Sequence, residues 1–458
     1  MQTRRNAPAV VGLSTVVVVV VAAVLVPGLS GWDVHVRSFA PLHAKWDPRV
    51  GPGTLPAVAL AVLAVVIGPR LVARSRWPWL LVGAYAVTVA WFVSLALVDG
   101  TAGIGHLLDT RYEYMDTARA VAGRPFAETL DGYIPRIAVG PDKWPVHIAG
   151  HPPGALLFYV VLVRLGATTG LAAGWVTLLV AATTPVAVLL TVRRLGAVSA
   201  ARRAAPFLVL GPVAVWSAVS ADAVFAAFAA WAAFLLAVAA TSRTRAVVAG
   251  VGTASGLVFG YCVMLSYGLP LLGVLAVAVL VVARNARPFV WAVLGAVVVV
   301  GGFALWGFAW WEAYPVLRER YYDGVAHNRP FSYWAWGNLG AFAVSAGPLA
   351  GAAVAQTVAI VVRTARSGSG GLHDRVRAWW ALPRPVLVPV VLALGGTAMV
   401  FLADASGMSK AEVERIWLPF APWVLVGTAL LPPRWRRIGL VVQLATALLV
   451  QHTLDTGW

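Results

Sequence analysis

The sequence predicts an all-α protein that crosses a membrane many times. Of its 458 residues, 60% are hydrophobic and 12% are charged, and the mean hydropathy is +0.81. Uninterrupted apolar runs such as "VVGLSTVVVVVVAAVLVPGL" match the hydrocarbon thickness of a bilayer. They are too long and too uniform for the strands of a membrane barrel, so the spanning segments must be helices.

About thirteen apolar segments follow one another along the chain. Arg4 and Arg5 precede the first, which has no clean small-residue cleavage site, so we expect a retained signal anchor. Cys262 is the sole cysteine, which excludes a disulfide within the chain. The expected spans are 9–28, 56–69, 78–98, 171–192, 204–220, 223–241, 247–265, 267–283, 288–309, 337–362, 385–403, 416–431 and 438–452.

The distribution of charge explains the net charge of +17 and predicts the topology. Seven short basic loops carry 21 of the 35 basic residues, and Asp374 is their only acid. The positive-inside rule puts these loops in the cytoplasm, against anionic lipid, and the C-terminus outside. This distribution argues against a nucleic-acid partner. The abundance of arginine, alanine and valine is typical of a GC-rich bacterial genome. The basic clusters are Arg4/Arg5, Arg70/Arg74/Arg76, Arg193/Arg194/Arg202/Arg203, Arg243/Arg245, Arg284/Arg287, Arg363 to Arg384 and Arg434/Arg436/Arg437.

Three regions are expected. Residues 1–77 would form an accessory N-terminal pair of helices, 78–309 a catalytic membrane core, and 310–458 the C-terminal helices. The core holds the long extracytoplasmic loop 99–170, and the C-terminal region has outer loops at 310–336 and 404–415. Within the first loop, His151 to Gly166 is expected to form a juxtamembrane or re-entrant helix. A loop of that length in a compact membrane protein is usually functional.

The stretch "HLLDTRYEYMDTARAVAGRP" concentrates charge in that loop. Thr110-x-x-Glu113 has the spacing of a capping box, which predicts a structural role for Glu113. Asp116 is expected on a solvated face. Asp109 precedes the cap near the outer membrane surface, where it could be either a catalytic carboxylate or an anion stabilised by a helix dipole.

Two motifs together resemble a known enzyme class. "LLDTRYEYMDTARAVAGRP" followed by "AGHPPGALLFYVVLVRLGA" resembles the C superfamily of membrane glycosyltransferases, in the branch of protein O-mannosyltransferases and the lipid A aminoarabinose transferase. Asp109, Tyr112 and Ala118-Arg119 fit the first motif, and His151-Pro152-Pro153 fit the second. Segments 219–240 and 412–425 resemble later helices of the same branch.

The resemblance implies transfer of a sugar, with inversion, from a polyprenyl-phosphate donor to an extracytoplasmic glycan, lipid or protein acceptor. Asp109 would be the general base, and cationic side chains would stabilise the lipid phosphate that leaves. Two alternatives remain open, because tryptophans around 310–336 also suit an interfacial belt and Asp222 also suits a helix start. The other candidate substrate-binding or lipid-phosphate-binding residues are His151, Arg415, Arg318, Arg320, Arg329, His327, Tyr112 and Asp222.

No cofactor is certain from these motifs. Thr110 replaces the family's acid after the aspartate, which puts a divalent metal in doubt, and His35, His43 and His147 have no tight ligand spacing. A transporter or lipid-linked sugar flippase is the main alternative, favoured by the glycine and proline residues within 256–270. A structural membrane partner is a third. Charges at helix ends favour chemistry on a membrane-anchored substrate over transport.

Overall fold

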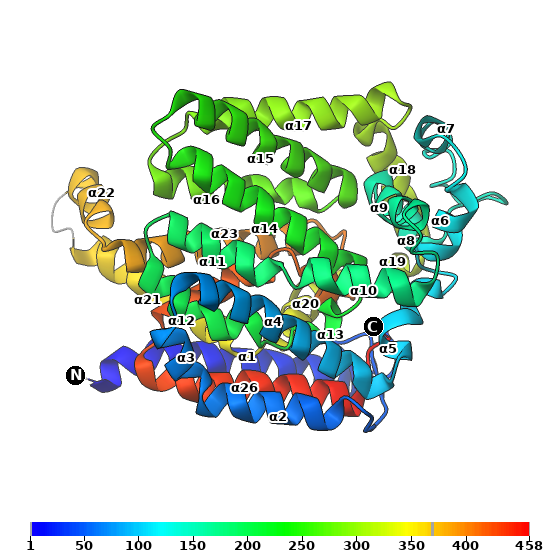
Figure 1. Ribbon diagram of the computed structural model, residues 1–458. Helices are drawn as coiled ribbons and strands as arrows, with labels where there is room; N and C mark the ends of the chain where they lie inside the picture. The colour runs from blue at the N-terminus through cyan, green and yellow to red at the C-terminus, as the bar shows by residue number, and fades with distance from the viewer. Residues whose placement is uncertain (1, 368–370, 458) are drawn as a thin grey trace.

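Long α-helices lying side by side form the body of the protein (Figure 1). The computed structural model describes residues 2–367 and 371–457. Within these residues the only sheet is one antiparallel pair of two-residue strands, β1 (Lys45–Trp46) and β2 (Leu454–Asp455). This pair joins the segment after the first helix to the end of the described chain. The fold is therefore all-α, as the sequence predicts.

Eight helical segments within the described residues are long and apolar enough to cross a membrane. A ninth would be a bent pair, in which α2 (Thr54–Val66) and α3 (Gly68–Arg74) meet at 56°. The chain is thus a multi-pass membrane protein by length and composition. The eight are α1 (Gln2–Ser30), α4 (Trp77–Ala96), α10 (Gly170–Ala181) continuing into α11 (Thr184–Arg194), α14 (Ala221–Ala240), α15 (Arg245–Leu265), α17 (Pro288–Leu305), α21 (Leu349–Ser367) and α23 (Arg384–Ala405).

Even with the bent pair counted, four of the thirteen expected spans do not meet this test, mainly because their helices are short or broken. The segment expected at 204–220 divides into α12 (Val198–Val209) and α13 (Ala214–Ser217), with Pro212 between them. The segment at 416–431 forms only α25 (Ala421–Val426) and a 3₁₀ turn, η4 (Gly427–Leu430). Proline lacks the amide hydrogen that continues a helix, which accounts for such breaks. The other two are α16 (Leu272–Ala283), preceded by η3 (Leu269–Leu271), and α26 (Pro433–Thr453), whose first turns carry three arginines.

Helices α15 and α17 lie close together because of small residues. A Cβ added at Gly256 would lie 2.0 Å from the backbone oxygen of Ala292, which leaves room for glycine alone. Such contacts are typical of helix pairs in membranes, where lipid offers no hydrophobic force between helices. Helix α15 runs through Gly256 and Gly260 without a break. These glycines, which suggested a transporter, therefore pack a continuous helix and do not interrupt it.

The alanine-rich helix α14 lies at the centre of the bundle. It packs against α10, α11, α15 and α16, and most of its side chains are buried. Alanine has a short side chain that loses no rotamer entropy, so a helix rich in it can be approached closely from several sides. The first turn of α14, with Asp222, is thereby surrounded by other helices.

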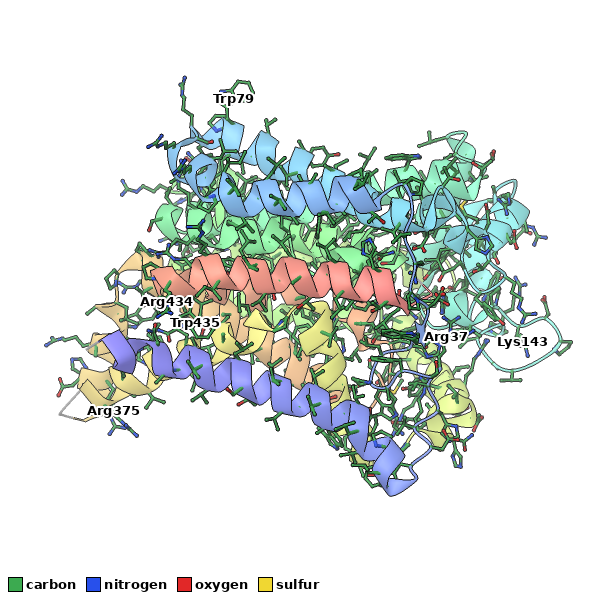
Figure 2. The ribbon with its side chains drawn as sticks, turned by 90° about the horizontal axis from the view of Figure 1, so that it is seen from below. Arg37, Trp79, Lys143, Arg375, Arg434 and Trp435 are labelled. Carbon is green, nitrogen blue, oxygen red and sulfur yellow. The ribbon has the colours of Figure 1, made fainter. Side chains whose placement is uncertain are left out.

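Contacts between loops group the loops at two opposite ends of the bundle. At the end that we call the basic end, predicted cytoplasmic loops contact one another: Arg202 donates to Ser75, and Arg284 donates to Trp380. At the opposite end, which we call the loop end, predicted outer segments meet, as where Asp99 accepts from Gln451. Figure 2 shows Arg375 and Arg434 at the basic end and Arg37 and Lys143 at the loop end. The grouping of loops expected from charge is thus the grouping that the structure has.

Short helices gather at the loop end (Figure 1). The apolar segment after His151 is α9, a helix of 12 residues that is largely buried, which agrees with the expected short helix. The elements at this end are η1 (Leu97–Asp99), α5 (Ala102–Gly105), η2 (Leu107–Asp109), α6 (Met115–Val121), α7 (Phe126–Asp131), α8 (Val146–Ala149), α9 (Pro153–Arg164), α18 (Trp310–Asp323), α19 (Val325–Asn328), α20 (Phe331–Ser345) and α24 (Val413–Ile416). Of these elements, α24 and α9 contact α14 near the charged side chains described next.

Candidate active site

Five ionisable side chains, which we call the charged cluster, converge at the loop end: Glu113, His147, Asp222, Glu412 and Arg415. The Arg415 guanidinium donates to Asp222 Oδ2 at 2.7 Å and to Glu412 Oε2 at 2.7 Å, and its Nη2 lies 3.4 Å from His147 Nε2. Nδ1 of His147 lies 2.5 Å from Glu113 Oε1. The side chains of Glu113, Asp222 and Arg415 are at most 6% exposed. Burial of so many charges is costly unless they are paired, and here each is.

Two contacts orient the ring of His147. A guanidinium can only donate, so Nε2 of His147 is the acceptor toward Arg415. Nδ1 then carries the proton that is donated to Glu113. The cluster thus combines an imidazole, one arginine and three carboxylates, and a carboxylate orients the imidazole as in acid-base dyads.

Asp222 reaches Arg415 from the first turn of α14. The N-cap of this helix is Ser220, whose hydroxyl accepts from the backbone N–H of Ala223 at 3.3 Å. The capping role that the sequence allowed for Asp222 therefore belongs to Ser220. The Asp222 side chain is left to pair with Arg415, at the helix end where the dipole favours an anion.

A strained turn presents Glu412 and Arg415. Ala411 and Glu412 both have left-handed backbone angles, with φ of +72° and +60°. Residues with a Cβ adopt this conformation only at a cost, and such strain persists where the surroundings impose it. The buried Asn338 does so here, because its Oδ1 accepts from Ala411 N–H at 3.2 Å and its Nδ2 donates to the Ser409 carbonyl at 2.7 Å. This turn places Glu412, the residue before α24, next to Arg415 of the same short helix.

The expected capping box at Thr110 and Glu113 is wrong. Helix α6 begins at Met115, its N-cap is Tyr114, and no side chain caps it. Glu113 lies in the turn before the helix, where its N–H donates to the Thr110 carbonyl. Its carboxylate turns inward to His147 instead of back to its own backbone. The local pattern was compatible with a cap, but pairing with a distant histidine determines the position of the side chain.

His151 adjoins the charged cluster. Its Nδ1 lies 2.7 Å from the His147 carbonyl oxygen and 2.9 Å from the Tyr114 hydroxyl, and its Nε2 lies 4.0 Å from Asp222. Burial lowers the pKa of His151, so the ring is neutral at pH 7. Tyr114 stacks on Tyr159 with ring centroids 4.9 Å apart, and burial raises the pKa of Tyr114. The predicted residues His151, Asp222 and Arg415 are therefore brought together.

Two neighbouring glutamates have opposite electrostatic environments. Burial raises the pKa of Glu414 to about 7, and its Oε1 accepts from the His43 N–H at 3.1 Å. Burial would also raise the pKa of Glu412, but Arg415 outweighs it and lowers the pKa to about 2. Burial lowers the pKa of His43. At neutral pH Glu412 is fully ionised, whereas Glu414 is close to half protonated.

Asp109 belongs to a separate group of contacts. Its carboxylate accepts from Arg119 Nη1 at 2.9 Å and from the N–H of Gly170, the first residue of α10, at 2.8 Å. Arg119 also pairs with Asp116 and donates to the carbonyl of Thr168. The side chain of Asp109 is 38% exposed and that of Asp116 58%, as expected for a solvated face at Asp116. The structure thus gives Asp109 the helix-start contact that was its alternative, and its catalytic role stays a prediction.

The other predicted site residues do not contact the charged cluster in the described structure. Arg320 and Arg329 donate to backbone carbonyls of other loop-end segments, at 2.6 to 3.1 Å, and so tie the loops together. Arg318 and His327 are exposed, and Arg318 lies over the ring of a neighbouring tyrosine. Tyr112 is 46% exposed and accepts from the adjacent arginine.

Sequence reasoning missed three members of the charged cluster, namely Glu113, His147 and Glu412. His147 lies four residues before His151, so a shared site could have been suspected from that spacing. Among the described residues, no three His, Cys, Asp or Glu side chains are arranged to hold a metal ion. No model of a known protein family and no curated protein sequence matches the chain, so the site rests on its geometry.

Proposed function

We propose that the protein is an integral membrane glycosyltransferase of the cell membrane, with its active site on the extracytoplasmic side. It would transfer a sugar with inversion from a polyprenyl-phosphate donor to a glycan, lipid or protein acceptor. The observation that carries the proposal is the charged cluster, which places a carboxylate–imidazole pair and a shared arginine at one end of the helices. Acid-base groups at a helix end suit a substrate whose lipid tail stays in the bilayer and whose head group lies at the surface.

The Glu113–His147 pair is the proposed base. A hydroxyl that attacks an anomeric carbon must lose its proton, which a carboxylate–imidazole pair can accept when the hydroxyl is within hydrogen-bond reach. Glu113 orients the ring through Nδ1, and Nε2 would accept the proton of the hydroxyl once the hydroxyl displaces the 3.4 Å contact of Nε2 with Arg415. Asp109 is the competing base, supported by motif position but engaged by Arg119 and Gly170.

Arg415 has a positioning role in this proposal. Its guanidinium donates to both Asp222 and Glu412 and lowers the pKa of Glu412 beside the base. The net negative charge of the cluster suits the oxocarbenium-like charge that develops at a sugar carbon during glycosyl transfer. The leaving phosphate would instead meet side chains that remain exposed, of which Arg318 and His327 were predicted for this purpose.

The test is transfer by the full chain in liposomes from a panel of polyprenyl-phosphate sugars. Glu113→Gln should lower the rate at least about 100-fold, the usual loss when acid-base catalysis is removed. Asp116→Asn, an exposed acid on the same segment, is the matched control and should retain the wild-type rate. If Asp109→Asn abolishes transfer and Glu113→Gln does not, Asp109 is the base. Donor uptake across the bilayer without transfer would favour a flippase and contradict the proposal.

A further inference from the structure

A pocket lined by three arginines lies at the basic end, away from the charged cluster. It has a volume of about 480 Å³ and is formed by α12, α21, α23, α26 and the segment that precedes α26. Arg203, Arg363 and Arg436 contribute its cationic side chains, and Gln356 lies beside them. Its other lining residues are apolar or proline: Ile360, Val386, Ala429, Leu430, Leu431, Pro432 and Pro433. Such a pocket has a cationic part and an apolar part.

The arginines have no anionic partner. Within the described residues, no ion pair joins Arg203, Arg363 or Arg436 to a carboxylate, and no acidic residue lines the pocket. Arg203 donates once, to the Pro385 carbonyl at 3.2 Å, and Arg363 donates to a carbonyl of its own helix at 3.0 Å. The buried Nε atoms of Arg203 and Arg436 have no hydrogen-bond partner. A guanidinium carries five donors and no acceptor, so much of its bonding capacity is unused here.

Positive charges gathered at one pocket repel one another, and buried donors without acceptors are costly. A bound anion would remove both costs. Phosphate suits the pocket best, because the planar fork of arginine binds its oxygens two at a time. The apolar lining indicates that the ligand also has hydrocarbon, as a membrane lipid does.

We propose that this pocket binds the phosphate headgroup of an anionic lipid at the basic end of the bundle. Arg203 and Arg436 would hold the phosphate oxygens, and the apolar residues would contact the first part of the acyl chains. The site is independent of the proposed glycosyl transfer, since it lies at the opposite end and shares no residue with the charged cluster. It differs from general attraction of basic loops to anionic lipid, because it requires particular arginines.

Lipid retention by the full chain tests the proposal. The protein is placed in nanodiscs with equal phosphatidylglycerol and phosphatidylcholine, exchanged into detergent, and its retained lipids are measured by native mass spectrometry. The wild type should retain phosphatidylglycerol about tenfold over phosphatidylcholine. Arg203→Gln and Arg436→Gln should each reduce that retention about tenfold, the usual effect of losing a charge-assisted hydrogen bond. Arg437 is an exposed arginine next to Arg436, so Arg437→Gln is the control and should retain phosphatidylglycerol as the wild type does.

Three results would overturn the proposal. Equal retention of both lipids excludes a phosphate-specific lipid site. An equal loss of phosphatidylglycerol retention in Arg437→Gln and Arg436→Gln shows a general surface attraction and no specific site. Stabilisation of the detergent-solubilised protein by inorganic phosphate, without preference for phosphatidylglycerol, shows a soluble anion in place of a lipid. Arg436→Lys keeps the charge and removes the fork, so it serves if Arg436→Gln does not fold, with a loss of retention still expected.

Discussion

Replacement of Asp222 by asparagine probes the pairing at the centre of the charged cluster. The substitution keeps the shape of the side chain and removes its charge. Arg415 then loses one of its two carboxylate partners and keeps Glu412. Because Asp222 and Arg415 are 2% and 5% exposed, water cannot replace the lost partner.

The size of the effect follows from burial. Breaking a buried ion pair by removal of one partner costs about 3 to 5 kcal/mol. Because Arg415 keeps its contact with Glu412, we expect Asp222→Asn to cost about 3 kcal/mol, the lower end of this range. Unfolding entropies of about 2 cal/mol/K per residue convert this to a drop in Tm of about 3 °C for a chain of 458 residues. Asp109→Asn is the matched control. Its ion pair with Arg119 is more than one-third exposed on both sides and should change Tm by less than about 1 °C.

Thermal unfolding of the detergent-solubilised protein at pH 7.5, followed by tryptophan fluorescence, measures both changes. The reasoning requires Asp222→Asn to be clearly less stable than Asp109→Asn. If both variants melt within 1 °C of the wild type, the Asp222–Arg415 pair is not the buried contact described here. If Asp109→Asn is the less stable variant, the contacts around the start of α10 contribute more to stability at this end of the bundle than the Asp222–Arg415 pair.

Three further predictions concern other parts of the chain. The pKa of Glu414 is raised from 4.5 to about 7, so ionisation of Glu414 lowers the free energy of unfolding as pH rises from 4.5 to 7, by roughly 3 kcal/mol in total. Glu414→Gln should remove this pH dependence from melting curves recorded between pH 5 and 8. Gly256→Ala should force α15 and α17 apart and cost about 1 to 3 kcal/mol, whereas Gly250→Ala in the same helix, with open space around it, should not destabilise. Arg320→Gln should release the loop between α7 and α8 and increase its proteolysis, with the exposed Arg318→Gln as control.

Charge distribution made the arrangement of the two ends predictable. Arginine strongly prefers one side of the membrane, so the seven basic loops could be grouped before any contact was known. The spans were less predictable where proline and charge compete with apolarity. Residues 204–220 are apolar enough to span, yet the helix ends after Val209 and resumes only at Ala214. Hydropathy measures the preference for lipid and does not report whether the backbone can continue a helix.

The candidate site was predictable in part for a similar reason. His151, Asp222 and Arg415 were each predicted as binding residues on the outer side, and contacts bring them together, whereas Asp109 lies in a separate group of contacts. Glu113 and His147 were not predicted, because the local spacing of Glu113 suited a cap equally well. The Glu113 carboxylate, in the turn before α6, meets His147 of α8, a histidine 34 residues away, which no local spacing indicates. Local patterns describe what a side chain can do, and tertiary contacts select one of those uses.

Among the described residues, buried charges are paired at the loop end and unpaired at the basic end, which is why we propose different roles for the two ends. At the loop end every member of the charged cluster has a partner of opposite charge or a hydrogen-bonded imidazole, so the cluster is complete without a ligand and can respond to a proton. At the basic end Arg203 and Arg436 share a pocket without a carboxylate, so the pocket is complete only with an anion. Paired carboxylates beside a histidine suit proton transfer, whereas unpaired arginines beside apolar residues suit the binding of a lipid phosphate. Under the two proposals, the loop end would carry out the chemistry and the basic end would bind a lipid phosphate.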